Sequence, residues 1–281
     1  MKNQSDFTVE LSRTAFFFDF DGTLAEIAPD PSGVEVDPRI VEALGALWRN
    51  SGGALAIVSG RTVDDLDRFL SPLKLPASGV HGLEMRDAEG EYRRADYDGG
   101  EMERLTCAVA SFAEQHSGLL SEVKPGSVAL HYRQRPDLHQ ACADLAGRLA
   151  AELPGVSLMR GKMVFELRLG GRTKADAVAQ FMAMRPFAGR QPVFVGDDVT
   201  DEDAFREVEG SGGYGIKIGA GRTAARFRAA DQGAFATWLC HIAAISACEK
   251  ASLLSGGQIE RAEPDGGIGR SGRSAATSGA P

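Results

Sequence analysis

The sequence predicts an α/β protein in which a parallel sheet covered by helices is interrupted by a small inserted α+β domain, and three observations carry this prediction. Strand-like apolar runs alternate with helical patterns near the start of the chain. The same alternation returns towards its end. Between the two, the order helix, strand, strand occurs twice. The alternation is typical of parallel sheets, and the repeat is typical of a two-layer domain.

The parallel sheet is predicted from two groups of segments. In the first group, a strand over 15–18 precedes a helix over 38–50, and a strand over 54–58 precedes a helix over 63–70. The second group continues in the order helix, strand, helix, strand, over residues 173–184, 192–195, 201–208 and 214–218. The first strand has no polar face, as expected of a strand buried on both sides of a sheet.

The inserted domain is predicted from the middle of the chain. Apolar residues at helical spacing predict a helix over 102–116. Two strands, a second helix and two further strands follow it, at 119–124, 127–133, 136–153, 156–160 and 163–169. This order predicts two helices on one side of an antiparallel sheet.

Changes in composition and pattern set the expected domain boundaries. We expect a discontinuous core over residues 1–100 and 169–246 and an inserted cap over 101–168. Residues 247–281 are rich in Gly, Ser and Pro and have almost no apolar side chains, so we expect a disordered tail there.

Composition and charge exclude several classes of function. A hydrophobic content of 43% allows a sizeable core, and a net charge of -8 argues against nucleic acid as a partner. No apolar run approaches the roughly 20 residues of a membrane span, and the amino terminus lacks the apolar stretch of a signal peptide. We therefore expect a soluble, cytoplasmic protein that does not bind membranes. Nothing in the sequence demands more than a monomer. No C-x-x-C spacing occurs, so buried free thiols are expected at Cys107, Cys142, Cys240 and Cys248.

Polar motifs follow three of the predicted strands. They are D-F-D-G-T at 19–23, S-G-R at 59–61 and G-D-D at 196–198. In an open parallel sheet, ligands bind outside the carboxyl ends of the strands, so we expect the motifs to meet at one site. The first motif alone is also compatible with an ordinary turn, because Gly22 permits a positive φ and Asp21 can form an Asx-turn. The joint occurrence of all three favours a functional site.

Helix starts are predicted beside these motifs. Thr and Asp lie three residues apart, as in a capping box, at Thr62 and Asp65, Thr173 and Asp176, and Thr200 and Asp203. Lys174 would then lie in the first turn of its helix, where the helix dipole disfavours a cation. A nearby anion would offset this repulsion, so the position of Lys174 indicates an anion close by.

Together these residues predict a site for phosphoryl transfer. Asp19, Asp21 and Asp197 supply the hard oxygen ligands that Mg²⁺ prefers. Lys174 and the hydroxyl of Ser59 supply donors for phosphate oxygens. The metal and the lysine would lower the pKa values of the carboxyl groups and keep a nucleophile ionised. A carboxylate can then attack phosphorus and form an aspartyl phosphate.

These motifs resemble those of the haloacid dehalogenase-like superfamily of phosphohydrolases, which has a Rossmann-like core. The resemblance implies Asp19 as the nucleophile and Asp21 as the general acid and then the general base. It also implies that Ser59 and Lys174 hold the transferred phosphoryl group. In that superfamily the residue at Asp21 binds the metal through its backbone carbonyl. The implied Mg²⁺ site, with the last residue in support, comprises Asp19, Asp21, Asp197 and Asp198.

Longer segments are similar to the trehalose-phosphatase family within that superfamily. They are DFDGTLAEIAPDP, VSGR, GVHGLE, ALHYR, FELRLGGRTKADAV and GDDVTDEDAF, and the similarity covers nearly all of residues 15–240. It implies Mg²⁺-dependent hydrolysis of trehalose 6-phosphate through an aspartyl phosphate, in trehalose biosynthesis, with a mobile cap. The alternatives are a phosphatase for another sugar phosphate, such as sucrose 6-phosphate or a glycosyl-glycerate phosphate, a sugar-phosphate mutase, or a binding module without turnover.

The cap strands predict a charged face. Alternation along 127–133 places His131 and Arg133 on one face and three apolar side chains on the other, and Glu166 and Arg168 share a face in the last cap strand. If helices cover the apolar face, the charged face suits a sugar, although an ordinary solvated surface is the alternative. The resemblance implies that the sugar is gripped by Glu122, Lys124 and Glu166. Besides the two aspartates of the first motif, the other binding candidates are Phe20, Gly60, Arg61, His81, His131, Arg133 and Asp201.

Overall fold

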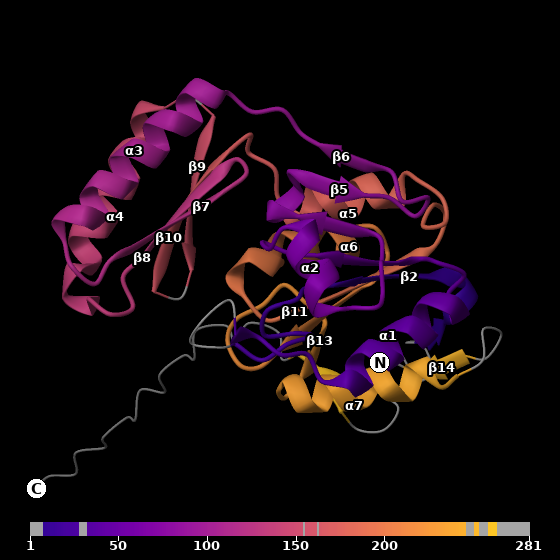
Figure 1. Ribbon diagram of the computed structural model, residues 1–281. Coiled ribbons are helices and arrows are strands. Elements are labelled where there is room, and N and C mark those ends of the chain that lie inside the picture. The colour runs from indigo at the N-terminus through magenta and orange to yellow at the C-terminus, as the bar shows by residue number, and fades with distance from the viewer. Residues whose placement is uncertain are drawn as a thin grey trace, which may run out of the picture.

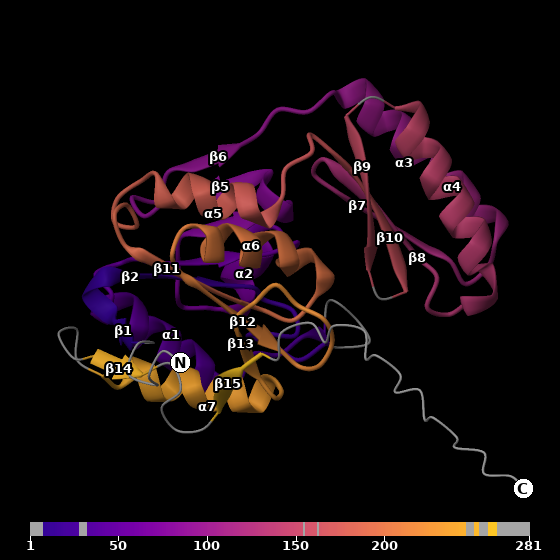
Figure 2. The ribbon, with the colours of Figure 1, turned by 180° about the vertical axis from the view of Figure 1, so that it is seen from behind.

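The computed structural model describes residues 8–27, 33–153, 155–161, 163–245, 250–252 and 258–262. Figure 1 shows a larger α/β core and a smaller cap. The cap is inserted between two segments of the core, and two linkers join the domains (Figure 2). The predicted fold class is therefore confirmed.

The core contains a nine-stranded sheet in the order β15-β13-β12-β11-β2-β3-β4-β5-β6. Its parallel part comprises β2 (Thr14–Phe18), β3 (Leu55–Val58), β4 (Ala77–Gly79), β11 (Gln191–Gly196), β12 (Tyr214–Ile218) and β13 (Phe227–Ala229). The antiparallel strands at the two edges are β5 (Glu84–Arg86), β6 (Tyr92–Arg94) and β15 (Ile259–Arg261). Because β11, β2 and β3 are neighbours, their carboxyl ends place the three polar motifs side by side.

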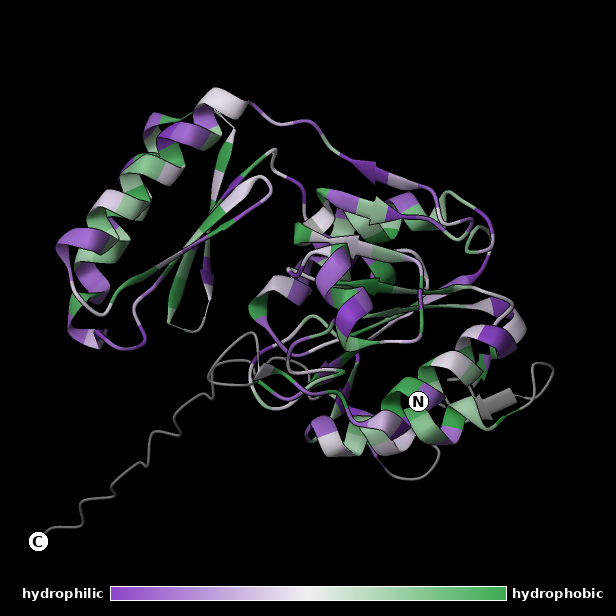
Figure 3. Cartoon of the chain, in the orientation of Figure 1, coloured by the Kyte–Doolittle hydropathy of each residue, from purple (hydrophilic) through white to green (hydrophobic). Residues whose placement is uncertain are grey.

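Helices cover both faces of this sheet (Figures 1 and 2). One face packs against α1 (Pro38–Asn50), α2 (Val63–Phe69) and α7 (Gln232–Ala243), and the other against α5 (Lys174–Met182) and α6 (Glu202–Gly210). Phe16 and Phe18 of β2 face the first group, whereas Phe17 faces α5 and packs on Phe181. A strand without a polar face therefore fits the middle of the sheet. By contrast, the edge strand β6 is hydrophilic (Figure 3).

The cap has two helices on one side of a four-stranded antiparallel sheet with the order β7-β8-β10-β9. Its elements are α3 (Gly99–Gln115), β7 (Leu120–Lys124), β8 (Ser127–His131), α4 (His139–Glu152), β9 (Val156–Gly161) and β10 (Val164–Leu169). Val128, Leu130 and Tyr132 belong to the hydrophobic cluster between the sheet and the helices. The predicted repeat and the predicted apolar face are both confirmed.

Most element boundaries lie within a few residues of the predictions. The helix predicted over 102–116 begins earlier, because Asp98 caps it by accepting from the backbone N–H groups of Gly100 and Glu101. Short 3-10 helices lie at Leu11–Arg13, Val80–Gly82, Pro136–Leu138 and Val199–Asp201. The third of these replaces the first turn of the helix predicted over 136–153, so α4 begins at His139.

The prediction of a disordered tail over 247–281 is wrong for two short segments. β14 (Lys250–Ser252) pairs with β1 (Thr8–Glu10), and β15 pairs with β13 at the edge of the core sheet. Ile259 of β15 is buried in the cluster that contains α7. Each strand has only three residues and is held by pairing, so no pattern in the sequence indicates it. The other tail residues lie outside the described part of the chain.

The cysteine prediction is correct for Cys142 of α4, which is buried and free, and wrong for two others. Cys107 in α3 and Cys240 in α7 are exposed, because each of these helices packs through only one of its sides. Cys248 lies outside the described residues. Among the helices that the structure describes, none is long and apolar enough to cross a membrane.

Candidate active site

One cavity of about 860 Å³ lies between the core and the cap. The motifs after β2, β3 and β11 form its floor, and the cap sheet forms its roof. The predicted site residues that line it are Asp19, Asp21, Ser59, Gly60, Arg61, Glu122, Lys124, His131, Arg133, Glu166, Lys174, Asp197 and Asp198. Phe20 and Asp201 do not line it and are fully buried in the core. The side chain of His81 lies outside what the structure describes.

A buried ammonium group joins two carboxylates at the floor. Lys174 Nζ donates to Asp19 Oδ1 at 2.6 Å and to Asp201 Oδ1 at 2.7 Å. Lys174 is the first residue of α5, and Thr173 and Asp176 form the predicted capping box before it. The two carboxylates are thus the anions that offset the helix dipole at this position. Burial alone would lower the pKa of Lys174, but these carboxylates raise it above its ordinary value.

Asp19, Asp197 and Asp201 form an acidic group in which each residue offers an oxygen within 4.8 Å of the others. Burial raises the pKa of Asp19 well above its usual range, and Asp201 and Asp197 add to this while Lys174 opposes it. Burial, Asp201 and Asp198 raise the pKa of Asp197 to about 7. Asp197 Oδ1 is buried and has no hydrogen-bond partner among the described residues. A divalent cation would neutralise such crowded carboxylates, so the acidic group fits a metal site.

Two motif glycines are required because carboxylates pack against the backbone. Gly22 has a φ of +80°, and a Cβ atom there would lie 2.2 Å from Asp197 Oδ2. A Cβ atom on Gly196 would lie 2.3 Å from Asp201 Cγ. A side chain at either position would displace a member of the acidic group. The turn at Gly22 is therefore part of the site. The first motif can thus be an ordinary turn and belong to the functional site at the same time.

A helix starts beside the third motif as predicted, but Thr200 and Asp203 do not form its capping box. A 3-10 turn over Val199–Asp201 precedes α6, and Asp198 forms a capping box with Asp201 instead. The backbone N–H of Asp198 donates to Asp201 Oδ2 at 2.9 Å, while Asp201 Oδ1 accepts from the buried ammonium group. Asp201 thus connects the helix start after β11 to α5. The three-residue spacing of Asp198 and Asp201 is compatible with the capping box, but it does not indicate the bond to Lys174.

Arg61 holds the side chain of Asp21 apart from the acidic group. The guanidinium group donates to both oxygens of Asp21, at distances from 2.6 to 3.1 Å. Its Cζ lies 5.3 Å and 4.8 Å from the ring centroids of Phe20 and Phe69. The backbone N–H of Arg61 donates to Ser59 Oγ at 3.1 Å. Phe20 therefore supports Arg61 from the core, and its side chain does not reach the cavity.

Charged side chains from neighbouring cap strands line the roof. Glu122 Oε2 lies 2.8 Å from His131 Nε2, and Glu122 Oε1 lies 3.4 Å from Lys124 Nζ. The bond from His131, assisted by Lys124, lowers the pKa of Glu122. The register places Glu122 and Glu166 on either side of Ala129, so both carboxylates share one face. The predicted charged face is confirmed.

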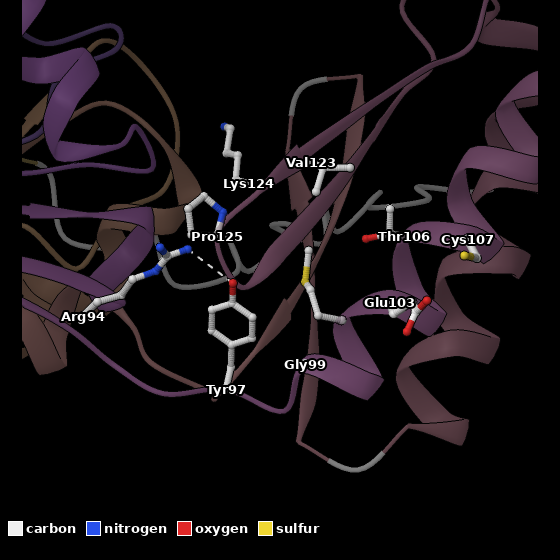
Figure 4. A pocket seen from close by; sticks show the side chains of 10 residues that line it. Arg94, Tyr97, Gly99, Glu103, Thr106, Cys107, Val123, Lys124 and Pro125 are labelled. Atoms are coloured by element: carbon white, nitrogen blue, oxygen red, sulfur yellow. Dashed lines mark hydrogen bonds between the residues drawn. The ribbon is translucent and has the colours of Figure 1, made fainter.

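A second, more open cavity of about 510 Å³ lies beside the linker that leads into α3 (Figure 4). In it, Arg94 donates to the hydroxyl of Tyr97 at 3.2 Å. Lys124 lines both this cavity and the larger one.

Solved structures share this arrangement of core and cap. The C-terminal domain of trehalose-6-phosphate phosphatase from C. albicans has a TM-score of 0.73 and 23% identity, and the match covers 86% of this chain and 94% of that one. At this identity the match shows the fold alone. A trehalose-6-phosphate phosphatase related protein has a TM-score of 0.64 and 27% identity, with coverage of 82% and 96%.

Curated sequences match over the same region. Trehalose-6-phosphate phosphatase of Escherichia coli (strain K12) is 41% identical over 233 residues, which are 83% of this chain and 88% of that protein. A probable trehalose-phosphate phosphatase of Sinorhizobium fredii is 40% identical over 216 residues, with coverage of 76% and 81%. Residues 17–232 match the family profile described as Trehalose-phosphatase, a span that includes the cap and all three motifs. The chain therefore belongs to the trehalose-phosphatase family, whose members are phosphoric monoester hydrolases.

Proposed function

We propose that this protein is a Mg²⁺-dependent phosphatase that hydrolyses trehalose 6-phosphate to trehalose and phosphate. One observation supports this most strongly: a single cavity joins the buried pair of Lys174 and Asp19 at its floor to the charged cap face at its roof. The floor suits phosphoryl transfer, and the roof suits a sugar with many hydroxyl groups. The names of the curated relatives support trehalose 6-phosphate as the sugar phosphate.

The proposed Mg²⁺ ligands are Asp19, Asp197 and the backbone carbonyl of Asp21, with Asp198 in support. Asp197 contributes a buried oxygen that has no hydrogen-bond partner among the described residues. Asp201 stays bound to Lys174 and adds negative charge. When bound, the ion supplies positive charge that stabilises the phosphoryl oxygens and the crowded carboxylates.

Asp19 is the proposed nucleophile. Its Oδ1 accepts from Lys174, and its backbone N–H donates to the carbonyl of Val195 at 2.9 Å, so the carboxylate is fixed at the end of β2. Its Oδ2 attacks phosphorus, and the bond from phosphorus to the sugar oxygen breaks as the aspartyl phosphate forms. Lys174 and the hydroxyl of Ser59 hold the phosphoryl oxygens during this step.

Asp21 is the proposed acid and base. It gives its proton to the leaving sugar oxygen, and it then takes a proton from the water that attacks the aspartyl phosphate. Arg61 keeps Asp21 at the cavity, where the side chain of Asp21 is 41% exposed. Arg61 donates to both oxygens of Asp21. When one of these oxygens carries the proton, its hydrogen bond from Arg61 is weakened.

The cap is proposed to select the sugar. Glu122, Lys124 and Glu166 would bind its hydroxyl groups, with His131 and Arg133 beside them. Closure of the cap would exclude bulk water from the floor. All of these groups come from one chain, so a monomer is sufficient for the proposed reaction.

The test is phosphate release with Mg²⁺ from trehalose 6-phosphate, sucrose 6-phosphate and glucose 6-phosphate. We expect kcat/KM for trehalose 6-phosphate to exceed the other values by at least about 10²-fold, because a roof built for hydroxyl groups rejects a sugar that leaves them unpaired. Preference for another of these esters would contradict the sugar assignment. Isomerised sugar phosphate without free phosphate would indicate a mutase instead.

A further inference from the structure

We infer that Arg168 is a positioning residue that ties the cap to the core by pairing with Asp203 when the cap closes, an inference that rests on the proposed function. Arg168 lies in β10 of the cap, and Asp203 lies in the first turn of α6 in the core. Neither residue lines the larger cavity.

Arg168 carries a buried donor, Nε, that its neighbouring strands do not satisfy. The residue is 6% exposed, and its Nε has no hydrogen-bond partner among the described residues. The sheet register places it between Ser127 and Ser157. The hydroxyl of Ser127 is buried without a partner in the described part of the chain, and that of Ser157 donates to the backbone carbonyl of Arg168. Because a buried donor without a partner is costly, this arrangement points to an acceptor from another element.

Two carboxylates lie close enough to act on Arg168. Burial lowers the pKa of Arg168, and Glu166 and Asp203 oppose this effect. Glu166 is on the same strand and lines the larger cavity. Asp203 comes from the core, next to the 3-10 turn over Val199–Asp201 that contacts β9 of the cap. Figure 2 shows α6 over one face of the core sheet, with one end of the helix towards the cap sheet.

Asp203 can change partner at little cost. Its side chain is 57% exposed and pairs with Arg206 of the same helix at 2.7 Å. An exposed pair three residues apart on a helix contributes little to stability. Arg168, by contrast, would gain a partner for its buried Nε donor. Pairing between Arg168 and Asp203 therefore favours the state in which the cap lies closest to α6.

This pairing would also fix the position of the charged cap face relative to the floor of the larger cavity. Glu166 is two residues from Arg168 on the same face of β10, so fixing Arg168 fixes Glu166 over the floor. A small aryl phosphate does not fill the roof. Loss of the pair should therefore affect turnover of trehalose 6-phosphate more than that of p-nitrophenyl phosphate.

The kinetic test compares Arg168→Gln, Asp203→Asn, the double variant and the charge reversal Arg168→Asp with Asp203→Arg. Each single change is expected to lower kcat/KM for trehalose 6-phosphate about tenfold, mainly through KM, with less than about a twofold change for p-nitrophenyl phosphate. The double variant should be no worse than either single one, and the charge reversal should restore activity. Asp203→Asn changes an exposed side chain, so it remains informative if Arg168→Gln does not fold.

Arg206→Gln is the matched control, because it frees Asp203 and leaves Arg168 in place. It is expected to retain kcat/KM within about twofold of the parent. A loss in Arg168→Gln with normal activity in Asp203→Asn would overturn the pairing. A second result would also overturn the pairing. In it, both single variants lose activity, these losses add in the double variant, and the charge reversal does not restore activity.

A measurement without substrate separates this inference from the proposed function. Cys107 in the cap and Cys240 in the core are exposed, so spin labels on them report the distance between the domains, with Cys248→Ser as the background. In the presence of Mg²⁺ alone, we expect a short-distance population that Arg168→Gln and Asp203→Asn lose and Arg206→Gln keeps. Identical distributions in all variants would overturn the inference. If the distances shift as expected while the parent does not hydrolyse trehalose 6-phosphate, the proposed function fails and the pairing stands.

Discussion

The floor and the roof of the larger cavity are built differently. At the floor, Asp19 and Lys174 are 4% and 3% exposed and are joined by a 2.6 Å hydrogen bond. At the roof, the side chains of Glu122 and Lys124 are 35% and 24% exposed and lie 3.4 Å apart. Buried contacts hold one arrangement, whereas partly exposed ones can exchange partners with sugar hydroxyl groups. In the proposed function, the core thus fixes the catalytic groups in advance, and the cap leaves sugar recognition adaptable.

The largest expected effect lies at the floor. Asp19→Asn removes the proposed nucleophile and a charged partner of Lys174, so turnover should fall at least about 10³-fold. The loss should be equal for trehalose 6-phosphate and p-nitrophenyl phosphate, because both react at the same atom. Phosphate release measures the loss, and circular dichroism checks that the fold is intact. Near-normal turnover in this variant would contradict the assignment of Asp19 as the nucleophile.

The next effect concerns the metal site. EDTA should abolish phosphate release, and excess Mg²⁺ should restore it. Asp197→Asn should lower kcat about 10²-fold and reduce the rise in Tm that Mg²⁺ gives the parent, because a bound ligand stabilises only the form that binds it. Asp144→Asn, a change at an exposed aspartate of α4, controls for the lost charge. An equal rise in Tm in Asp197→Asn and the parent would contradict the assignment.

Changes at the roof should lower kcat/KM for trehalose 6-phosphate more than that for p-nitrophenyl phosphate. Glu122→Ala and Glu166→Ala are each expected to lower kcat/KM for trehalose 6-phosphate by about 10- to 100-fold and to change that for p-nitrophenyl phosphate less than about twofold. The reason is that, in the proposed function, only the sugar ester reaches the cap. Equal losses on both substrates would mean that these carboxylates act on the floor, and the contrast between the two regions would fail.

The sequence predicted the residues at the floor better than the residues that hold them in position. Asp19 and Lys174 follow a strand end and a helix cap, which local patterns indicate directly. Asp201 was only a binding candidate, because its bond to Lys174 joins residues that are far apart in the chain and that local spacing does not connect. The position of Arg61 depends on Phe20 and Phe69, which come from separate segments and meet only in the folded chain.

In the cap, the predicted faces were correct and the contacts to the core were not foreseen. Strand alternation has a period of two residues, so the side of β8 that carries His131 could be predicted from its sequence. The contact between β9 and the turn before α6 joins residues far apart in the chain, and no local pattern reports it. The short edge strands β14 and β15 escaped prediction for a related reason, since pairing with existing strands holds them.

The smallest expected effect concerns the contact between His131 and Glu122. His131, with Lys124, lowers the pKa of Glu122 in the folded protein. A carboxyl group of this kind contributes stability above its unfolded pKa and loses that contribution as the pH falls through its lower folded pKa. Glu122→Gln should therefore lower Tm slightly at pH 7, and the difference from the parent should vanish towards pH 3. Because the side chain of Glu122 is 35% exposed, solvent screens the contact and keeps the difference small.

Thermal unfolding at low ionic strength between pH 7 and pH 3 measures this difference. Glu114→Gln, at an exposed position of α3, is the matched control and should show no such dependence on pH. A difference for Glu122→Gln that persists unchanged at pH 3 would mean that Glu122 acts through packing, not through charge. Its contacts would then be as fixed as those of Asp19 and Lys174, and adaptable recognition would have to reside elsewhere in the roof.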